Sequence, residues 1–456
     1  MDQENVIEQG EPVVADLKRV LGRKELFAMA TSQVIGAGIM VLVGTGIAYT
    51  GRSVNLAFII SAIFTILMSI PMIFIGGTLR LRGGNYTILA ALIGKTWAGA
   101  SMVVFLISNM AISIYSISFA SYFIGLTGLN ISPVLVASVS MTTFYVVNLF
   151  GMSRVSKIQN IMILCLISAL VIFMAFGVTK VDWNGAFGGT ADWMPGGLNG
   201  LFMAGATLTY ATGGATSIIN LGAEAKNPTK DIPIVIIVAT LAISVVYAIM
   251  GTVAAGVLPI SAVAGQSLLL VAKAILPSGF YEFFVICGAM FALSATLNAM
   301  LSMLTKPLLQ ACKDGWFPRK LGYIYPKFNT PIILLTMFYV IGMVPILFAV
   351  PISTVTALAL IVGKFFAIAS SLSVVNLPRK VPEIWAKSKV HVSTPMLWVV
   401  GLLGAGSSVA QFIILASRQA TWVWYGNAIL LVVAFGYTYF RNKSGKVQME
   451  VSYEAA

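Results

Sequence analysis

Long apolar runs, set between clusters of charged and turn-forming residues, dominate this chain of 456 residues. Hydrophobic residues make up 58% of it and charged residues only 9%, whereas charged residues are about a quarter of a typical soluble domain. About 20 apolar residues cross a bilayer as a helix, so the pattern predicts an all-α polytopic membrane protein. Twelve transmembrane helices are expected at 26–50, 54–79, 97–126, 131–150, 155–178, 197–222, 233–258, 279–305, 331–350, 353–378, 395–416 and 420–440.

The basic residues indicate how these helices are oriented. With the N-terminus in the cytoplasm, 23 of the 28 Lys and Arg lie inside and 4 outside, and Lys364 falls within a run. This asymmetry follows the positive-inside rule, so both termini are expected to be cytoplasmic. The net charge of +13 is therefore interpreted as a topology signal with some attraction to anionic lipids, not as nucleic-acid binding. The polar first 25 residues contain no apolar signal-peptide core, and no cleaved signal is expected.

Two of the runs are interrupted by glycines near their middle. The first contains Gly36-Ala37-Gly38 within TSQVIGAGIMV, and YATGGATS in the sixth contains Thr212-Gly213-Gly214. Glycine weakens a helix, and an opened backbone cannot face lipid but can line a polar cavity. Two interruptions five runs apart indicate an inverted-repeat transporter with broken helices at its site. Close helix packing is the alternative explanation for each glycine cluster.

An opened helix offers two kinds of backbone group to a substrate. Half-helix N-termini suit a carboxylate, and freed carbonyls suit an ammonium. An α-amino acid carries both groups, so we expect a small amino acid to bind at the two breaks. The residues predicted to line this site are Gln33, Ile35, Gly36, Ala37, Gly38, Ile39, Ala211, Thr212, Gly213 and Gly214.

Four motifs, in order along the chain, resemble the amino acid–polyamine–organocation (APC) superfamily of transporters. They are the small residues of the first break, Arg82-Gly83-Gly84-Asn85-Tyr86, the segment Ala225 to Pro233 (AKNPTKDIP), and Lys306 followed by Asp314-Gly315-Trp316-Phe317-Pro318. The resemblance implies alternating access by two inverted repeats of five helices, at 26–178 and 197–378, with helices 1 and 6 unwound mid-membrane. Two peripheral helices at 395–440 complete the fold. The expected connections are a cytoplasmic segment at 1–25, an extracellular loop at 179–196, a cytoplasmic loop at 379–394 and a cytoplasmic tail at 441–456.

Within the superfamily, the details are similar to the bacterial basic amino acid/polyamine antiporters. Asn109 precedes Ser121-Tyr122-Phe123 much as that group places a substrate-contacting Asn, and Tyr210 falls at its aromatic gate. The resemblance implies an exchanger in a bacterial inner membrane, moving an amino acid against a second amino acid or an amine. Proton-coupled symport is the alternative.

Three positions depart from that group. Thr216 stands where exchangers of cations have a Glu, and Leu166 where proton-coupled members have a Lys. Met300 replaces a bulky aromatic residue, which implies a differently shaped side-chain pocket. Without the Glu, a dication would lack a counter-charge, which argues against a polyamine or diamine as the principal substrate.

Lys364 is the one charge near the centre of a predicted helix, in LIVGKFFAIASS. A lysine at that depth is costly and is a functional candidate by default. It could contact a substrate carboxylate, or serve as a fixed or titrating charge in place of the helix 5 lysine. It could also bind freed carbonyls at helix ends, or snorkel to the interface.

Other classes of function have little support in the residues. A single His391 and three cysteines within or at the ends of apolar runs make a metal site or a disulfide framework improbable. We expect no cofactor, and an enzyme would need reactive groups clustered at one membrane depth. No phosphate-binding loop of the GxxxxGK[ST] type occurs, so ATP-driven transport is not expected.

Overall fold

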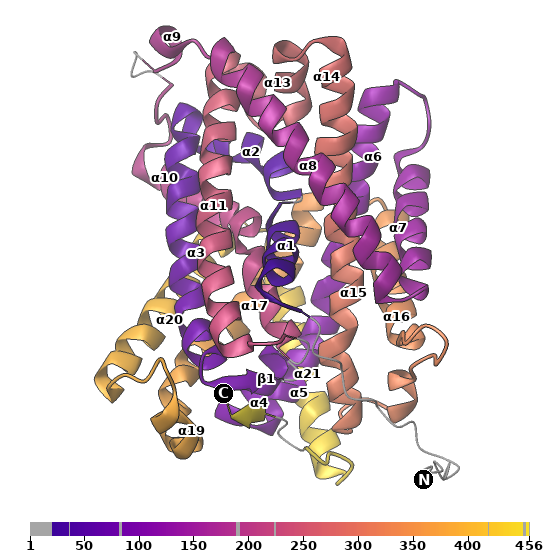
Figure 1. The fold of residues 1–456 in the computed structure, drawn as a ribbon, viewed down its shortest axis with the longest axis vertical. Coiled ribbons are helices and arrows are strands. Elements are labelled where there is room, and N and C mark those ends of the chain that lie inside the picture. The colour runs from indigo at the N-terminus through magenta and orange to yellow at the C-terminus, as the bar shows by residue number, and fades with distance from the viewer. Residues whose placement is uncertain are drawn as a thin grey trace.

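The computed structural model describes residues 21–35, 37–81, 84–187, 192–222, 225–417, 419–449 and 453–455. Nearly all of these residues are helical (Figure 1). In lipid, a helix satisfies its own backbone hydrogen bonds, which explains why the apolar runs adopt this structure. Eight helical segments are long and apolar enough to cross a membrane: Leu42–Gly76, Lys95–Thr127, Ile161–Lys180, Pro228–Val257, Ser278–Lys313, Thr354–Lys380, Thr394–Ile414 and Thr421–Lys443.

Each of the twelve apolar runs is helical over most of its length. The helices that occupy them are α1 (Arg23–Val34) with α2 (Ala37–Thr50), α3 (Val54–Gly76), α5 (Lys95–Ser108) with α6 (Ser113–Thr127), α7 (Pro133–Leu149), α8 (Met152–Lys180), α10 (Gly197–Thr212), α11 (Pro228–Val257), α14 (Ser278–Phe283) with α15 (Phe291–Lys313), α16 (Ile332–Leu347), α17 (Ile352–Ser373), α20 (Thr394–Ala416) and α21 (Thr421–Lys443).

Four of these runs change helix type along their length, the last of them only near its end, where the 3₁₀ helix η6 (Val374–Asn376) follows α17. A 3₁₀ helix, η2 (Asn109–Ile112), joins α5 to α6, and a second, η3 (Gly213–Leu221), continues α10. A π-helix, η4 (Phe284–Met290), joins α14 to α15. Such irregular turns inside long helices are frequent at functional sites, because they free or redirect backbone groups.

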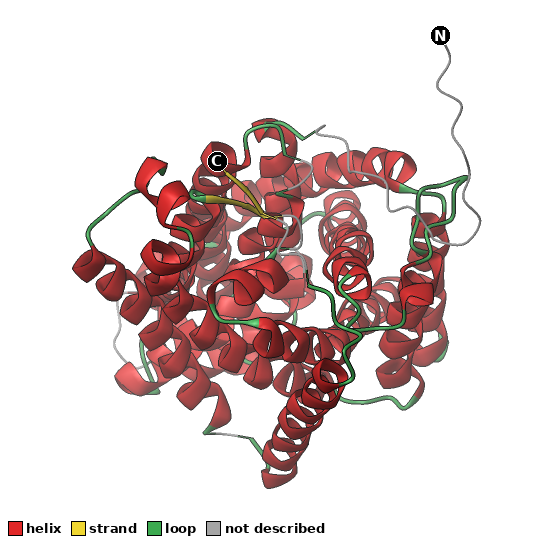
Figure 2. Cartoon of the chain, turned by 90° about the horizontal axis from the view of Figure 1, so that it is seen from below, coloured by secondary structure: helices red, strands yellow, loops and turns green. Residues whose placement is uncertain are grey.

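Seen end-on, the helices form one bundle (Figure 2). Helix α3 packs along α10 and α11, and α17 packs along α20. Helix α1 lies inside the bundle against α11, η3 and α15 (Figure 1). Short helices connect the longer ones: α4 (Asn85–Leu92), α9 (Trp183–Phe187), α12 (Ile260–Val263), α13 (Leu268–Ile275), α18 (Leu377–Lys380) and α19 (Pro382–Lys387).

A small β-ladder departs from the all-α prediction. Strand β1 (Leu79–Leu81) pairs antiparallel with β2 (Tyr453–Ala455) near the C-terminus. The pairing holds the end of the tail beside the turn that follows α3 (Figure 1). Two segments of three residues carry no readable periodicity, and their partners are far apart in sequence, so pattern analysis could not find them.

Two of the family-like motifs meet at this same end of the molecule. The Tyr86 hydroxyl donates a hydrogen bond to the Asp314 carboxylate, which also accepts one from Gln310. Burial, reinforced by the Asp314 charge, raises the pKa of the Tyr86 phenol well above its ordinary value. Tyr86 therefore stays protonated, and the contact joins α4 to the end of α15 as a structural link.

Candidate functional site

The first helix is interrupted where its glycines lie. Helix α1 ends at Val34, Ile35 is extended with φ −80° and ψ 93°, and α2 begins at Ala37. Gly36, which was predicted to line the site, lies outside the described residues. The Tyr247 hydroxyl on α11 caps one freed carbonyl, donating to Val34 O at 2.8 Å. The Thr296 hydroxyl on α15 donates to Ala292 O of its own helix at 2.9 Å and lies 3.4 Å from Ile35 O. Helix α11 therefore supplies a partner that lipid could not.

The second helix changes pitch instead of unwinding. Helix α10 ends at Thr212 and continues as the 3₁₀ helix η3 from Gly213. A switch from α to 3₁₀ bonding skips one backbone carbonyl. Hydroxyls of η3 stabilise the tighter turn: Thr216 donates to Gly213 O at 3.1 Å and Ser217 to Gly214 O at 2.7 Å. The prediction of an unwound stretch is thus corrected to a 3₁₀ segment at this position.

The two breaks are in direct contact, and their glycines have different roles. A Cβ on Gly214 would collide with the backbone of Gln33, and one on Gly38 with the backbone of Ala211. These two glycines allow close packing of the broken helices, which is the alternative role considered for the glycine clusters in the sequence. A Cβ on Gly213, in contrast, would meet no atom within 4 Å. Gly213 therefore faces open space at the junction of α10 and η3.

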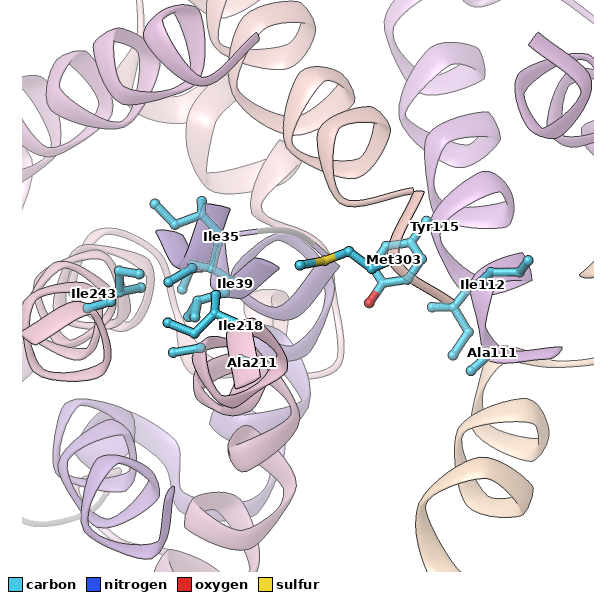
Figure 3. Close-up of a cluster of buried hydrophobic side chains, with 14 of the residues drawn as sticks. Ile35, Ile39, Ala111, Ile112, Tyr115, Ala211, Ile218, Ile243 and Met303 are labelled. Atoms are coloured by element: carbon cyan, nitrogen blue, oxygen red, sulfur yellow. The ribbon is translucent and has the colours of Figure 1, made fainter. Parts of the chain in front are cut away.

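A pair of tyrosines lies beside this junction. The hydroxyls of Tyr115 on α6 and Tyr210 on α10 are 3.4 Å apart. Tyr210 was predicted at an aromatic gate. Tyr115 was not predicted as a site residue, because no sequence pattern around it indicates contact with a residue 95 positions away. Figure 3 shows Tyr115 next to Ala111 and Ile112 of η2.

Gln33 reaches across to a methionine that the sequence did not single out. Its Nε2 lies 3.0 Å from the sulfur of Met303 on α15, and Met303 lies between Ile39 and Tyr115 in Figure 3. The predicted residue Met300 lies one turn earlier on α15 and is half-buried. Buried aliphatic side chains from the break after α1 and from α2, η3, α10 and α11 gather on the other side of this methionine: Ile35, Ile39, Ala211, Ile218 and Ile243.

Two of the predicted polar residues use their side chains within the protein. The Asn109 amide donates to Phe105 O in its own helix at 2.6 Å. The Thr212 hydroxyl is 2.7 Å from that of Ser61 and 2.8 Å from that of Thr65, both on α3. Thr212 therefore anchors the end of α10 against α3.

Lys364 is buried on α17, only 8% exposed, and so does not snorkel to a surface. Its Nζ donates to Oε1 of Gln411 on α20 at 2.5 Å and lies 3.5 Å from the sulfur of Met68 on α3. Across the parts of the chain that the structure describes, no ion pair joins Lys364 to a carboxylate. The helix 5 position, Leu166, is buried and apolar on α8.

The segments flanking the two broken helices are also joined. Before α1, Leu21 forms a parallel bridge with Ala225, and Leu21 O accepts from Lys226 N at 2.8 Å. Arg23, at the start of α1, forms an ion pair of 2.8 Å with Asp231 in the first turn of α11. The entry to the first broken helix and the exit from the second are therefore held together.

A groove of about 710 Å³ lies elsewhere, between α6, α7, α8 and α15. Its lining side chains are mainly apolar, and Leu135, Val139 and Ile161 among them are strongly exposed. The groove has no charged group among its lining residues and lacks the means to bind an ammonium or carboxylate. Within the described ranges, no cluster of three or more His, Cys, Asp or Glu could hold a metal ion.

Within the described residues, eight helical segments are long and apolar enough to cross a membrane, and two broken helices meet inside the bundle, an arrangement typical of membrane transporters. The amino acid permease family matches residues 21–436. The chain therefore belongs to this family of the APC superfamily, which confirms the predicted superfamily and the expectation of a transporter instead of an enzyme.

Relatives of this chain are named for different substrates. The chain is 25% identical over 400 residues to the branched-chain amino acid permease of Bacillus subtilis (strain 168), covering 81% of this chain and 83% of that protein. It is 23% identical to the methylthioribose transporter of the same organism, over 86% of this chain and 87% of that one. It is 24% identical to vacuolar cationic amino acid transporter 4 of Arabidopsis thaliana, over 69% of this chain and 56% of that protein.

Proposed function

We propose that this protein is an amino acid exchanger that works by alternating access and binds its substrate between the two broken helices. The observation that carries the proposal is the contact between the breaks, with Gly213 facing open space beside it. Paired breaks of this kind bind substrates in inverted-repeat transporters. The family's amino acid substrates supply the matching chemistry.

The backbone at the breaks suits both charged ends of an α-amino acid. The N-terminal turn of α2, from Ala37, presents free N–H groups and a positive dipole end to a carboxylate. The Val34 carbonyl accepts one hydroxyl, from Tyr247, and the Ile35 carbonyl has the Thr296 hydroxyl 3.4 Å away. A carbonyl has a second lone pair, which remains for an ammonium.

The surroundings of the breaks favour a substrate with a neutral side chain. Thr216 bonds the backbone of its own helix and offers no charge to a cation. The side chains gathered around Met303 are aliphatic or aromatic apart from the neutral amide of Gln33. A branched-chain permease among the relatives supports the same class, whereas a diamine would have to lose its hydration without a counter-charge.

The membrane arrangement is part of the proposal. Twelve transmembrane helices would form two inverted repeats, at 26–178 and 197–378, followed by two peripheral helices at 395–440. Both termini would lie in the cytoplasm of a bacterial cell, as the distribution of basic residues indicates. The link between Arg23 and Asp231 would then close the cytoplasmic side of the site.

Proton-coupled amino acid symport is the second candidate, and Lys364 supports it. Its buried ammonium contacts the neutral groups of Gln411 and Met68. Such a charge could serve as the fixed or titrating group of a coupled carrier. The two candidates differ in what drives net flux. An exchanger needs substrate on both sides, whereas a symporter needs a proton gradient.

Purified protein in liposomes tests the proposal. We expect uptake of a labelled neutral amino acid to rise several-fold when the vesicles contain unlabelled amino acid, because the loaded carrier returns faster than the empty one. A counterflow screen of amino acids and their decarboxylated amines would identify the substrate. Equally fast uptake into empty vesicles that follows an imposed pH gradient would contradict exchange and favour symport, and no uptake of any amino acid would contradict both.

A further inference from the structure

Gln411 on α20 is a fully buried polar residue to which the proposed mechanism assigns no role. Its Oε1 accepts from Lys364 on α17 at 2.5 Å and from the Thr209 hydroxyl on α10 at 3.0 Å. Its Nε2 lies 3.3 Å from Ser407 Oγ and 2.8 Å from the sulfur of Met68 on α3. A single amide therefore joins four helices, including one of the two peripheral helices.

The Thr209 contact places this amide next to the proposed site. Thr209 lies one helical turn before Gly213, at the end of α10 that leads into the second break. Its hydroxyl also lies 2.6 Å from Ala206 O. The hydroxyl has one proton, so it donates either to Gln411 or to its own helix. The choice between these two acceptors depends on the distance between α10 and α20.

The chemistry of the cluster differs from a structural ion pair. The Lys364 ammonium is held by a neutral amide, and no carboxylate in the described chain forms an ion pair with it. Removing the amide would leave a buried cation without its hydrogen-bond acceptor, a costly state in a low-dielectric interior. The position of Lys364 therefore depends on Gln411, and Gln411 in turn contacts α10, which leads into the second break.

We propose that Gln411 is a positioning residue that couples Lys364 to movements of α10 during transport. The inference rests on the proposed function, because α10 carries the second break of the substrate site. It gives α20, which lies outside the two proposed repeats, a working role in the transport cycle. Coupling between sites requires an element with two arrangements that both sites bias, and the inference assigns that role to the hydrogen bond between Thr209 on α10 and Gln411 on α20.

Substitutions at both ends of the contact test the inference. Gln411→Leu and Lys364→Met are expected to retain substrate affinity but to lower exchange rates by about tenfold. The double variant is expected to be no slower than the slower single one, because both changes break the same link. Thr209→Val should lower the rate in the same direction, whereas Thr209→Ser, which keeps the hydroxyl, should restore it.

The control is Ser408→Ala on the same helix. Ser408 is fully buried, and its hydroxyl bonds Gly404 O of its own helix at 2.9 Å, so its loss should leave exchange unchanged. Wild-type rates in Gln411→Leu and Thr209→Val, or rate losses that multiply in the double variant, would overturn the inference. If Gln411→Leu does not fold, the exchange rates of Thr209→Val and Thr209→Ser still test the inference. Failure of the wild type to carry any amino acid would instead refute the proposed function.

Discussion

Replacing Gly213 by leucine is expected to abolish amino acid exchange while leaving the protein folded. The new side chain would extend into the open space at the junction of α10 and η3, which the proposed site assigns to the substrate. Blocking that space should lower the initial rate of exchange by about a hundredfold or more, as misplacement of a bound substrate commonly does. The rate in liposomes and the melting temperature in detergent, measured on the same preparation, separate the two effects.

Two other glycines serve as controls for this experiment. Gly214→Ala should destabilise the fold by about 1–3 kcal/mol, because its Cβ would collide with the backbone of Gln33. Gly406 on α20 is exposed and has no atom near its Cβ position, so Gly406→Leu should change neither rate nor stability. Full exchange by the Gly213→Leu variant would show that the substrate does not occupy this space.

Replacing Lys364 by alanine is expected to lower the exchange rate by about tenfold or more at every pH tested. The ammonium binds Gln411 and contacts Met68, and in the described chain no second cation is placed to take over these contacts. A charge that stays fixed throughout the pH series contributes equally at each pH, so the loss should not depend on pH. Initial rates across a pH series, with equal amounts of protein in each liposome preparation, provide the measurement.

An exposed lysine gives the matched comparison. Lys273 on α13 lies at the protein surface, and Lys273→Ala should retain the wild-type rate throughout the pH series. A Lys364→Ala variant that keeps transport but loses only its pH dependence would identify Lys364 as a titrating group and favour symport. Wild-type behaviour of that variant at all pH values would remove Lys364 from the mechanism.

The helices and the positions of the breaks could be read from the sequence because lipid leaves few alternatives. An apolar run of membrane length has to form a helix, and a glycine cluster at its centre marks where that helix can open. The break after Val34 and the change at Gly213 lie where the glycines predicted them. The role of each glycine could not be predicted. Gly214 packs against Gln33 and Gly213 faces open space, but both are glycines in the sequence and nothing there distinguishes them.

The partners of the polar residues could not be predicted in this way. Gln411 is 47 residues beyond Lys364, and Thr212 bonds residues about 150 positions earlier. Contacts across such separations depend on how the helices rotate and slide, which the apolar pattern does not specify. The 3₁₀ form of η3 depends similarly on hydroxyls at Thr216 and Ser217 that stabilise the tighter turn. Membrane Ser and Thr bond their own helix so often that they gave no distinctive signal.

A structure determined by cryo-electron microscopy with the exchanged amino acid bound would test the central claim most directly. The account predicts density between Ile35 and Gly213, with the carboxylate at the N-terminal turn of α2 and the ammonium at the carbonyls of Val34 and Ile35. Density only in the groove between α6, α7 and α8, with the space beside Gly213 empty, would contradict it.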